Sequence, residues 1–212
     1  MIYLFKKKVE SRKSKGIRGL IPYALCLFLS SCNSDDESTI PKPKGYFRIE
    51  LPQKSYIKYT GECPFTFDYP SYAFLIDDKR PGAEPCWFDM VFPKFKSTLH
   101  FSYKPVNHNL GKYLEDSRTL AVKHEIKASG IDEQLIIKDS ANVFGLIYNI
   151  EGNAASSIQF YLTDSTQHFL RGALYFNSSP NSDSIAPVLE FIKKDVYRMV
   201  NSFEWKPSKC SG

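Results

Sequence analysis

The stretch that decides the fold is residues 134–176, QLIIKDSANVFGLIYNIEGNAASSIQFYLTDSTQHFLRGALYF. It holds four runs of β-branched and aromatic residues, and each run has the length and composition of a strand. The linkers between the runs are short and contain Asp, Asn, Gly and Ser, which favour turns. Because tight turns join antiparallel neighbours, the stretch predicts an antiparallel meander with strands at 134–138, 143–151, 157–163 and 168–176.

Residues 184–201 predict a helix that covers this sheet. Their apolar residues recur every three or four positions, Asp183 can cap the helix, and Pro187 fits its first turn. A second helix is predicted within residues 109–128, with Gly130 as its stop. The apolar face of this second helix comprises Leu110, Tyr113, Leu114, Ser117, Ala121 and His124.

The part of the chain before residue 109 predicts further strands. Alternation of apolar and polar residues places them at 46–51, 55–59, 65–69, 73–76, 87–92 and 99–103. The predicted fold class is therefore α+β, a mostly antiparallel sheet with two flanking helices. Of the 212 residues, 42% are apolar and 15% aromatic, which is enough for one substantial core. We therefore expect residues 45–212 to form a single globular domain.

The first 31 residues have the features of a bacterial lipoprotein signal peptide. A basic region precedes an apolar run at 20–29, which is shorter than the roughly 20 residues that a membrane-spanning helix needs. The run ends in Leu29-Ser30-Ser31-Cys32, which resembles the bacterial lipobox. The sequence thus predicts cleavage between Ser31 and Cys32 and lipidation of Cys32. The alternative is an ordinary signal peptide followed by a chance cysteine.

Residues 32–44 are expected to be the lipidated cysteine and an extended linker. Pro41 and Pro43 make the linker semi-stiff. The acidic cluster Asp35-Asp36-Glu37 either resembles the retention and surface-export signals of lipoproteins from gliding Bacteroidetes or is the start of a solvated tether. We expect a lipid-anchored protein of the cell envelope, in the outer membrane and facing the periplasm, with surface exposure as the other possibility.

Residues 1–31, the predicted signal peptide, account for the net charge of +5. Residues 1–31 contain seven basic residues and one acidic residue, so the rest of the chain has 21 basic and 22 acidic residues. Such a balance does not provide the basic surface that neutralises phosphates. The composition therefore predicts no nucleic-acid partner.

Three cysteines remain in the predicted exported domain: Cys63, Cys86 and Cys210. In an oxidising compartment a disulfide between Cys63 and Cys86 is the natural pairing, since both lie in aromatic, strand-like segments and Cys210 lies in the tail. The alternative is two buried free thiols.

The sequence offers few candidates for enzyme chemistry. It lacks the G-x-S-x-G, H-E-x-x-H and C-x-x-C motifs and a glycine-rich phosphate loop. The histidines, His100, His108, His124 and His168, have spacings that favour no single metal site. The carboxylate pairs Asp35-Asp36 and Asp77-Asp78 are predicted in loops, as solvated charges. We therefore expect no catalytic residues, no metal, no cofactor and no small-molecule substrate.

Several segments resemble the gliding-motility lipoprotein GldD family of Bacteroidetes. They are residues 41–49 (PKPKGYFRI), 67–70 (FDYP) and 85–89 (PCWFD), with Phe92-Pro93 shortly after. The resemblance implies an accessory protein needed for gliding and for the linked type IX secretion machinery, acting with other envelope lipoproteins, and it brings no catalytic residues. The strand meander closed by a helix and Ser202-Phe203 also resembles the PsbP/Mog1 sandwich, which concerns the fold alone.

Two hypotheses for the function follow. The first is a non-catalytic scaffold, tethered to the membrane, that binds motility proteins. The second is an envelope lipoprotein that binds a glycan or small ligand and is possibly enzymatic, with stacking aromatic residues along a cleft. The aromatic residues Tyr46, Phe47, Tyr56, Tyr59, Tyr69, Tyr72 and Trp87 are crowded in one half of the chain, where they fit either a core or an interface.

Overall fold

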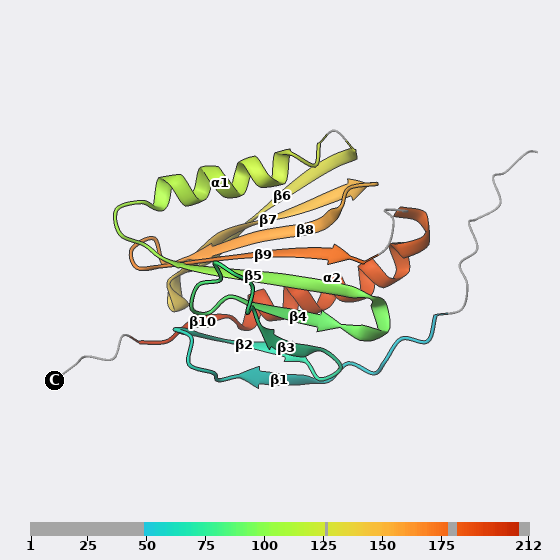
Figure 1. The fold of residues 1–212 in the computed structure, drawn as a ribbon, viewed down its shortest axis with the longest axis horizontal. Helices are drawn as coiled ribbons and strands as arrows, with labels where there is room; N and C mark the ends of the chain where they lie inside the picture. Colours follow the sequence, from blue (N-terminus) through green and yellow to red (C-terminus); the bar gives the residue numbers. More distant parts are fainter. Residues whose placement is uncertain (1–48, 126, 178–181, 208–212) are drawn as a thin grey trace, which may run out of the picture. The chain divides into compact units, whose positions relative to one another are not determined.

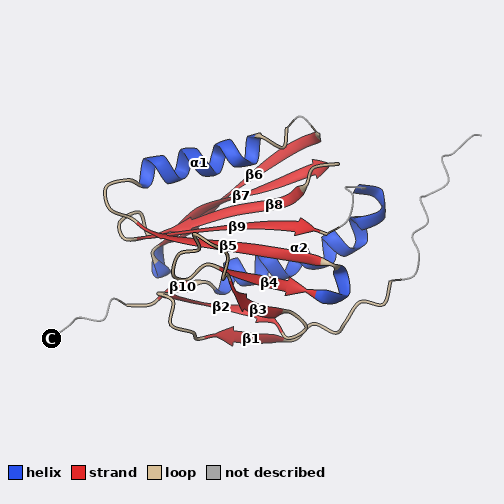
Figure 2. Cartoon of the chain, viewed as in Figure 1, coloured by secondary structure: helices blue, strands red, loops and turns tan. Residues whose placement is uncertain are grey.

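The computed structural model describes residues 49–125, 127–177 and 182–207. Its largest element is a seven-stranded antiparallel sheet (Figure 1). The strand order is β3-β4-β5-β9-β8-β7-β6. A second sheet has three strands in the order β1-β2-β10, also antiparallel. The two helices and the strands around them place the protein in the α+β class, as predicted (Figure 2).

The meander predicted from residues 134–176 is confirmed. Its strands β6, β7, β8 and β9 pair in sequence order, each antiparallel to the next. All three connecting turns use a positive φ, at Asn142, Gly152 and Ser165. A Cβ atom on Gly152 would lie 2.8 Å from the backbone nitrogen of Ser129, so this turn requires glycine. The strands are β6 Ala128–Lys138, β7 Val143–Gly152, β8 Ser156–Thr163 and β9 His168–Phe176.

The strands before the first helix divide between the two sheets. Strands β3, β4 and β5 form a meander that joins the large sheet through β5 and β9, whereas β2 pairs with β1 and with the C-terminal β10. The predicted strand at 46–51 is wrong for its described part, since Ile49–Leu51 has no strand partner. The bounds are β1 Tyr56–Tyr59, β2 Phe65–Pro70, β3 Phe74–Asp77, β4 Phe88–Phe92, β5 Ser97–Pro105 and β10 Glu204–Trp205.

Helix α1 (Leu110–Val122) ends earlier than the sequence predicted. Residues after Val122 turn back on themselves, with the backbone N–H of Ala128 bonded to the carbonyl of His124, and the chain then enters β6. Gly130 lies in that strand and stops no helix, because the ladder to β7 satisfies the backbone from Ala128 onward. Helix α2 (Ser182–Ser202) and two single 3₁₀ turns, η1 (Pro93–Phe95) and η2 (Asp139–Ala141), complete the elements.

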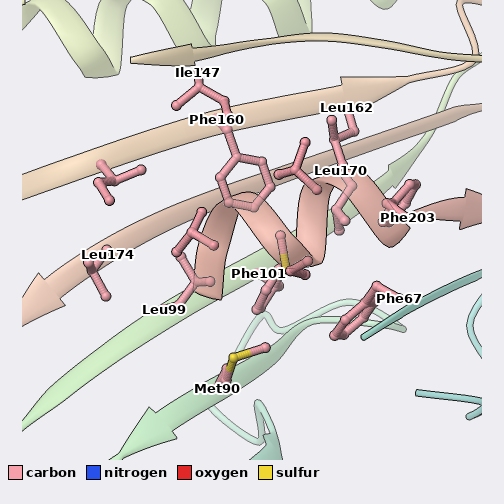
Figure 3. Close-up of a cluster of buried hydrophobic side chains, with 14 of the residues drawn as sticks. Phe67, Met90, Leu99, Phe101, Ile147, Phe160, Leu162, Leu170, Leu174 and Phe203 are labelled. Atoms are coloured by element: carbon pink, nitrogen blue, oxygen red, sulfur yellow. The ribbon is translucent and has the colours of Figure 1, made fainter. Parts of the chain in front are cut away.

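The two helices cover opposite faces of the large sheet. Alternate residues of β7 show this, because Ile147 packs in the cluster with α2 and Tyr148 packs with Ala121 of α1. The larger cluster lies between the sheet, α2 and β2, and Figure 3 shows its central side chains. Fully buried members include Phe67, Met90, Leu99, Phe160, Leu170, Leu174 and Phe203.

Candidate interaction site

A disulfide joins the turn after β1 to the loop before β4. The structure places Cys63 and Cys86 in one bond, with their Cα atoms 5.6 Å apart. Cys63 is 7% exposed, and Cys86 has a φ of 63°, an uncommon value for a residue other than glycine. We name the surface around this bond the Cys63–Cys86 corner. It comprises Tyr59, Gly61, Glu62, Cys63, Leu75, Asp77, Asp78 and the loop residues Glu84 to Phe88.

The loop between β3 and β4 is held by its own hydrogen bonds. Arg80 donates from Nε to Oδ1 of Asp78 at 2.9 Å and from a terminal nitrogen to Oδ2 at 2.7 Å. The same guanidinium, followed by the Arg80 backbone N–H, lowers the pKa of the Asp78 carboxyl to about 2. The loop closes where the N–H of Asp78 bonds to the carbonyl of Trp87. Its shape is therefore fixed at both ends.

Trp87 is anchored at the edge of the corner. Its indole N–H donates to the carbonyl of Tyr103 at 2.8 Å, and the ammonium of Lys104 lies 5.0 Å from the centre of its ring. Lys104 also pairs with Glu84. The tryptophan is thus held by one hydrogen bond and one cation above its ring.

Behind the corner lies a stack of aromatic rings. The ring centres of the stacked pair Phe88 and Phe101 are 4.5 Å apart. The ring of Tyr59 stacks on those of Phe67 and Phe88, with centre-to-centre distances of 5.0 Å and 5.7 Å. Burial raises the pKa of the Tyr59 hydroxyl. A Cβ atom on Gly61 would lie 2.4 Å from that hydroxyl. The close approach of the turn to the packed Tyr59 ring therefore favours glycine at position 61.

The corner encloses a cleft of about 540 Å³ with aromatic walls and acidic edges. Asp78 and Glu84 are paired with Arg80 and Lys104, whereas Glu62 and Asp77 are exposed and have no cationic partner among the described residues. Both sulfurs are in the disulfide, so the corner contains no thiol nucleophile. Chemically, such a cleft suits an apolar group that carries a positive charge.

A buried carboxylate ties the beginning of the described chain to α2. Asp195 is 1% exposed and accepts hydrogen bonds from Lys54 Nζ at 2.5 Å, from the Tyr56 hydroxyl at 2.8 Å and from the Tyr72 hydroxyl. Lys54 also lies over the ring of Phe191, 3.9 Å from its centre. Sequence analysis missed this cluster, although an acid within the apolar stripe of α2 was a visible signal.

The four histidines lie on separate elements and form no common site. His100 of β5 pairs through Nδ1 with Oδ1 of Asp89 at 2.6 Å, a cross-strand pair that sequence analysis missed. His108 precedes α1 and His124 follows it, and burial lowers the pKa of His124. Nδ1 of His168 lies 2.8 Å from the Tyr103 hydroxyl, and burial lowers its pKa as well.

A second cleft, of about 600 Å³, lies beside His168 and Trp205. The rings of these two residues stack, with their centres 5.0 Å apart. The Trp205 indole N–H is buried and has no hydrogen-bond partner among the described residues. Burial alone would raise the pKa of the nearby Asp164 carboxyl, but the backbone N–H groups of Gln167, His168 and Thr166 outweigh it and lower that pKa. Asp164 therefore stabilises its own turn.

Other predicted site residues lie outside the described part of the chain. Ser31 and Cys32, the acidic cluster with Asp35-Asp36, and Cys210 are among them. Within residues 49–125, 127–177 and 182–207, no group of three or more His, Cys, Asp or Glu side chains could hold a metal ion. Neither described helix combines the length and the apolar character needed to cross a bilayer.

Comparison with known families places the chain among the lipoproteins of gliding motility, a class that is anchored to membranes by lipid. Within that class the chain belongs to the family of the gliding motility lipoprotein GldD, whose model matches residues 36–205. The match confirms the family predicted from the PCWFD segment and its neighbours, and it includes the whole Cys63–Cys86 corner. No curated protein matches the chain.

The solution structure of cyanobacterial PsbP (CyanoP) from Synechocystis is similar to this one, with 12% sequence identity and a TM-score of 0.44. The alignment covers 75% of this chain and 97% of that one. A likeness of this size supports no argument about function.

Proposed function

We propose that this protein is a lipid-anchored, non-catalytic accessory of the gliding machinery and of the type IX secretion machinery linked to it. In this proposal the Cys63–Cys86 corner binds a partner protein of that machinery, such as another envelope lipoprotein. The observation that supports it most is that Pro85, Cys86 and Trp87, which belong to one of the segments of the family resemblance, line the cleft.

The construction of the corner fits recognition of a protein partner. Its loop is closed by a disulfide and by the Asp78–Arg80 pair, so little conformational freedom remains to be lost on binding. Trp87 and Tyr59 provide aromatic contact area, and aromatic anchors are enriched at binding hot spots. Glu62 and Asp77 supply negative charge for a basic side chain of the partner.

The anchor in this proposal is Cys32, freed by cleavage after Ser31 and joined to lipid. Two or three acyl chains, at about 0.8 kcal/mol per buried methylene, hold a protein on a membrane stably. We place the domain at the outer membrane, facing the periplasm. Proteinase K treatment of intact and lysed cells tests the side: protection in intact cells supports a periplasmic domain, and digestion places it on the cell surface.

The partner site is tested by charge reversal. Complexes are purified from crosslinked envelopes with the full-length protein and with a Glu62→Lys variant. The matched control is Glu115→Lys, which reverses one exposed acid on α1. We expect the corner variant to lose motility proteins and the control to retain them. Equal recovery by both variants would contradict the proposal.

The His168–Trp205 cleft favours a second candidate function, the binding of a glycan or small ligand. Its volume is sufficient for a small ligand, and the stacked rings of His168 and Trp205 line it as an aromatic surface. The chain has two tryptophans, so Trp87→Phe leaves Trp205 as the single fluorescent reporter. A saturable change in its emission with short glycans supports this function, and a constant emission counts against it.

A further inference from the structure

The most exposed large apolar residues lie on the two edges of the large sheet. They are Leu135 and Ile137 of β6, at 65% and 59% exposure, and Phe74 and Ile76 of β3, at 60% and 54%. Every other exposed large apolar residue among those described is at or below 47%. The strand order makes β3 and β6 the two edge strands. Each edge therefore presents a pair of apolar side chains two residues apart.

All four side chains point to the same face of the sheet. One row of directly paired residues runs across all seven strands, through Ile76, Asp89, His100, Ala173, Gln159, Tyr148 and Glu133. Directly paired residues share a face, so Ile76 and Glu133 lie on one side. Residues two and four positions along from Glu133 are Leu135 and Ile137, which therefore also lie on that side.

The two edge strands also have the same sense in the strand ladder. Six antiparallel pairings separate β3 from β6, and an even number of reversals restores the original direction. A second molecule placed beside the first, and rotated to continue the twist of the sheet, would thus bring its β3 parallel to the first molecule's β6. Both apolar pairs would then remain on one continuous face.

Residues 134–137 of β6 and 74–76 of β3 contain no charge, proline or bulge. Edge strands are commonly guarded by charges, prolines or bulges. The bulge of β6 lies at its start, between Ala128 and Gly130, and residues 134–137 carry no charge. Strand β3 has no charged residue before Asp77.

We propose that the protein associates with itself, with the β6 edge of one copy pairing in parallel with the β3 edge of the next. In this register Leu135 lies beside Phe74 and Ile137 beside Ile76. Lys138 then comes beside Asp77, an opposite charge. The ammonium of Lys138 already donates to the carbonyls of Asn201 and Phe203, both at 2.7 Å, and has a third N–H for the Asp77 carboxylate.

This interface is heterologous, because the two surfaces that meet are different. The copy at one end of the assembly keeps an unpaired β6 edge and the copy at the other end keeps an unpaired β3 edge, so the association continues without closing. The expected product is a linear array of copies with one extended sheet. It shares Asp77 with the Cys63–Cys86 corner but uses neither Glu62 nor the His168–Trp205 cleft, and its crosslinking test does not depend on the partner proposed above.

Cysteine crosslinking of the full-length protein in cells tests the register. Adjacent strands bring paired Cα atoms within about 5 Å, inside the roughly 4.4 to 6.8 Å range of disulfides. In a Cys210→Ser background, a chain carrying both Ile76→Cys and Ile137→Cys is expected to give a ladder of dimers, trimers and larger species under oxidation. Two chains carrying one substitution each, produced together, should stop at the mixed dimer.

The matched control pairs Ile137→Cys with Ile57→Cys, an exposed apolar position on β1 outside the large sheet. No ladder is expected from this pair. A missing ladder in the Ile76→Cys/Ile137→Cys chain, or an equal ladder in the control, would overturn the proposal. Leu135→Lys provides a second measurement: in detergent the full-length variant should sediment as a monomer with an unchanged melting temperature, and unaltered larger species would also refute the proposal.

Discussion

Among single residues, Asp195 is held by burial and by several hydrogen bonds at once. Its carboxylate is buried, and three groups from residues 54–72 donate to it. A buried charge is tolerated because its partners replace the hydrogen bonds of water. Removal of that charge leaves the Lys54 ammonium partly buried without a counter-charge.

We predict that Asp195→Asn lowers the free energy of unfolding by about 3 kcal/mol, the usual result of removing one partner of a buried ion pair. Urea unfolding followed by circular dichroism measures it. The control is Glu190→Gln on the exposed side of α2, where Glu190 lies 4.0 Å from Lys193. That surface pair should contribute under about 0.5 kcal/mol. Equal losses for the two variants would show that Asp195 is not specially stabilising.

The same cluster predicts loss of stability at alkaline pH. Burial, followed by the hydrogen bond to Asp195, raises the pKa of Tyr56 from its ordinary 10.0 to about 12, and the same causes raise that of Tyr72. A pKa raised by folding means that the folded protein holds the proton more tightly. The contribution is therefore complete below pH 10 and is lost as the pH rises through about 12.

Tyr56→Phe tests this pH dependence. The variant should lose less unfolding free energy than the wild type between pH 10 and 12, measured by urea unfolding at each pH. Tyr113→Phe, on α1 away from Asp195, is the control and should follow the wild type. If Tyr56→Phe also follows the wild type, the alkaline loss does not come from this cluster.

Residues with local signals were predictable, and residues with distant partners were not. Cys63 and Cys86 were paired from the expected oxidising compartment, their aromatic, strand-like segments and the position of Cys210 in the tail, and the structure joins them. Asp195 receives its hydrogen bonds from residues more than 120 positions earlier in the chain, so no local pattern could identify its partners. The Asp89–His100 pair depends on the register of a hairpin, which the sequence did not fix.

At the scale of elements, β7 and β8 meet closely at Gly145. A Cβ atom there would lie 2.0 Å from the carbonyl oxygen of Tyr161, a backbone atom that cannot rotate away. We predict that Gly145→Ala destabilises the protein by about 3 kcal/mol, the upper end of the usual overpacking cost. Gly111→Ala in α1 meets no atom within 4 Å and should stabilise by about 0.5 kcal/mol. Thermal unfolding of both variants compares them, and two changes of the same sign would contradict this account.

The disulfide links two elements that no strand pairing joins directly, the turn before β2 and the loop before β4. Its two cysteines are 23 positions apart, and closing a loop of that size contributes about 3 kcal/mol. We therefore expect the Cys63→Ser/Cys86→Ser variant to lose about that much stability. Intact mass after alkylation without reductant should show neither thiol of the native protein modified, and alkylation of both would exclude the bond.

Elements with strong periodicity were predicted closely, and element ends were not. The strand at 168–176 has the predicted bounds, and α2 differs from its prediction by a residue or two at each end. The end of α1 was wrong because the helical period continues to His124, although the chain leaves the helix after Val122. The ladder between β6 and β7 overrides local preference there, a tertiary effect that periodicity cannot reveal.

At the scale of the whole molecule, the predicted lipid on Cys32 determines where the protein resides. We expect Cys32→Ala to abolish labelling by palmitate, because the variant lacks the thiol that the lipid would modify. Cys26→Ala is the matched control, since Cys26 lies in the predicted leader. Labelled Cys32→Ala protein, or an unlabelled control, would contradict the assignment.

The fold class was predictable because most of the sheet is built from hairpins, whose partners are neighbours in sequence. The connection of the two halves was not predictable. Strand β5 pairs with β9 across the whole length of α1 and three strands, and β2 pairs with β10 near the end of the described chain. Such contacts leave no periodic trace in the sequence, so neither the second sheet nor the position of the corner against it could be derived.

The pairing of β2 with β10 has a consequence for biosynthesis. A ribosome releases Phe65 more than 130 residues before Phe203 and Trp205, which pack against its ring in the finished protein. The nascent chain therefore exposes an aromatic strand until its last segment has emerged, and non-local closure of this kind folds slowly. Completion of the fold is thus deferred until synthesis is nearly over, an interval during which a chaperone has an unfolded, apolar chain to bind.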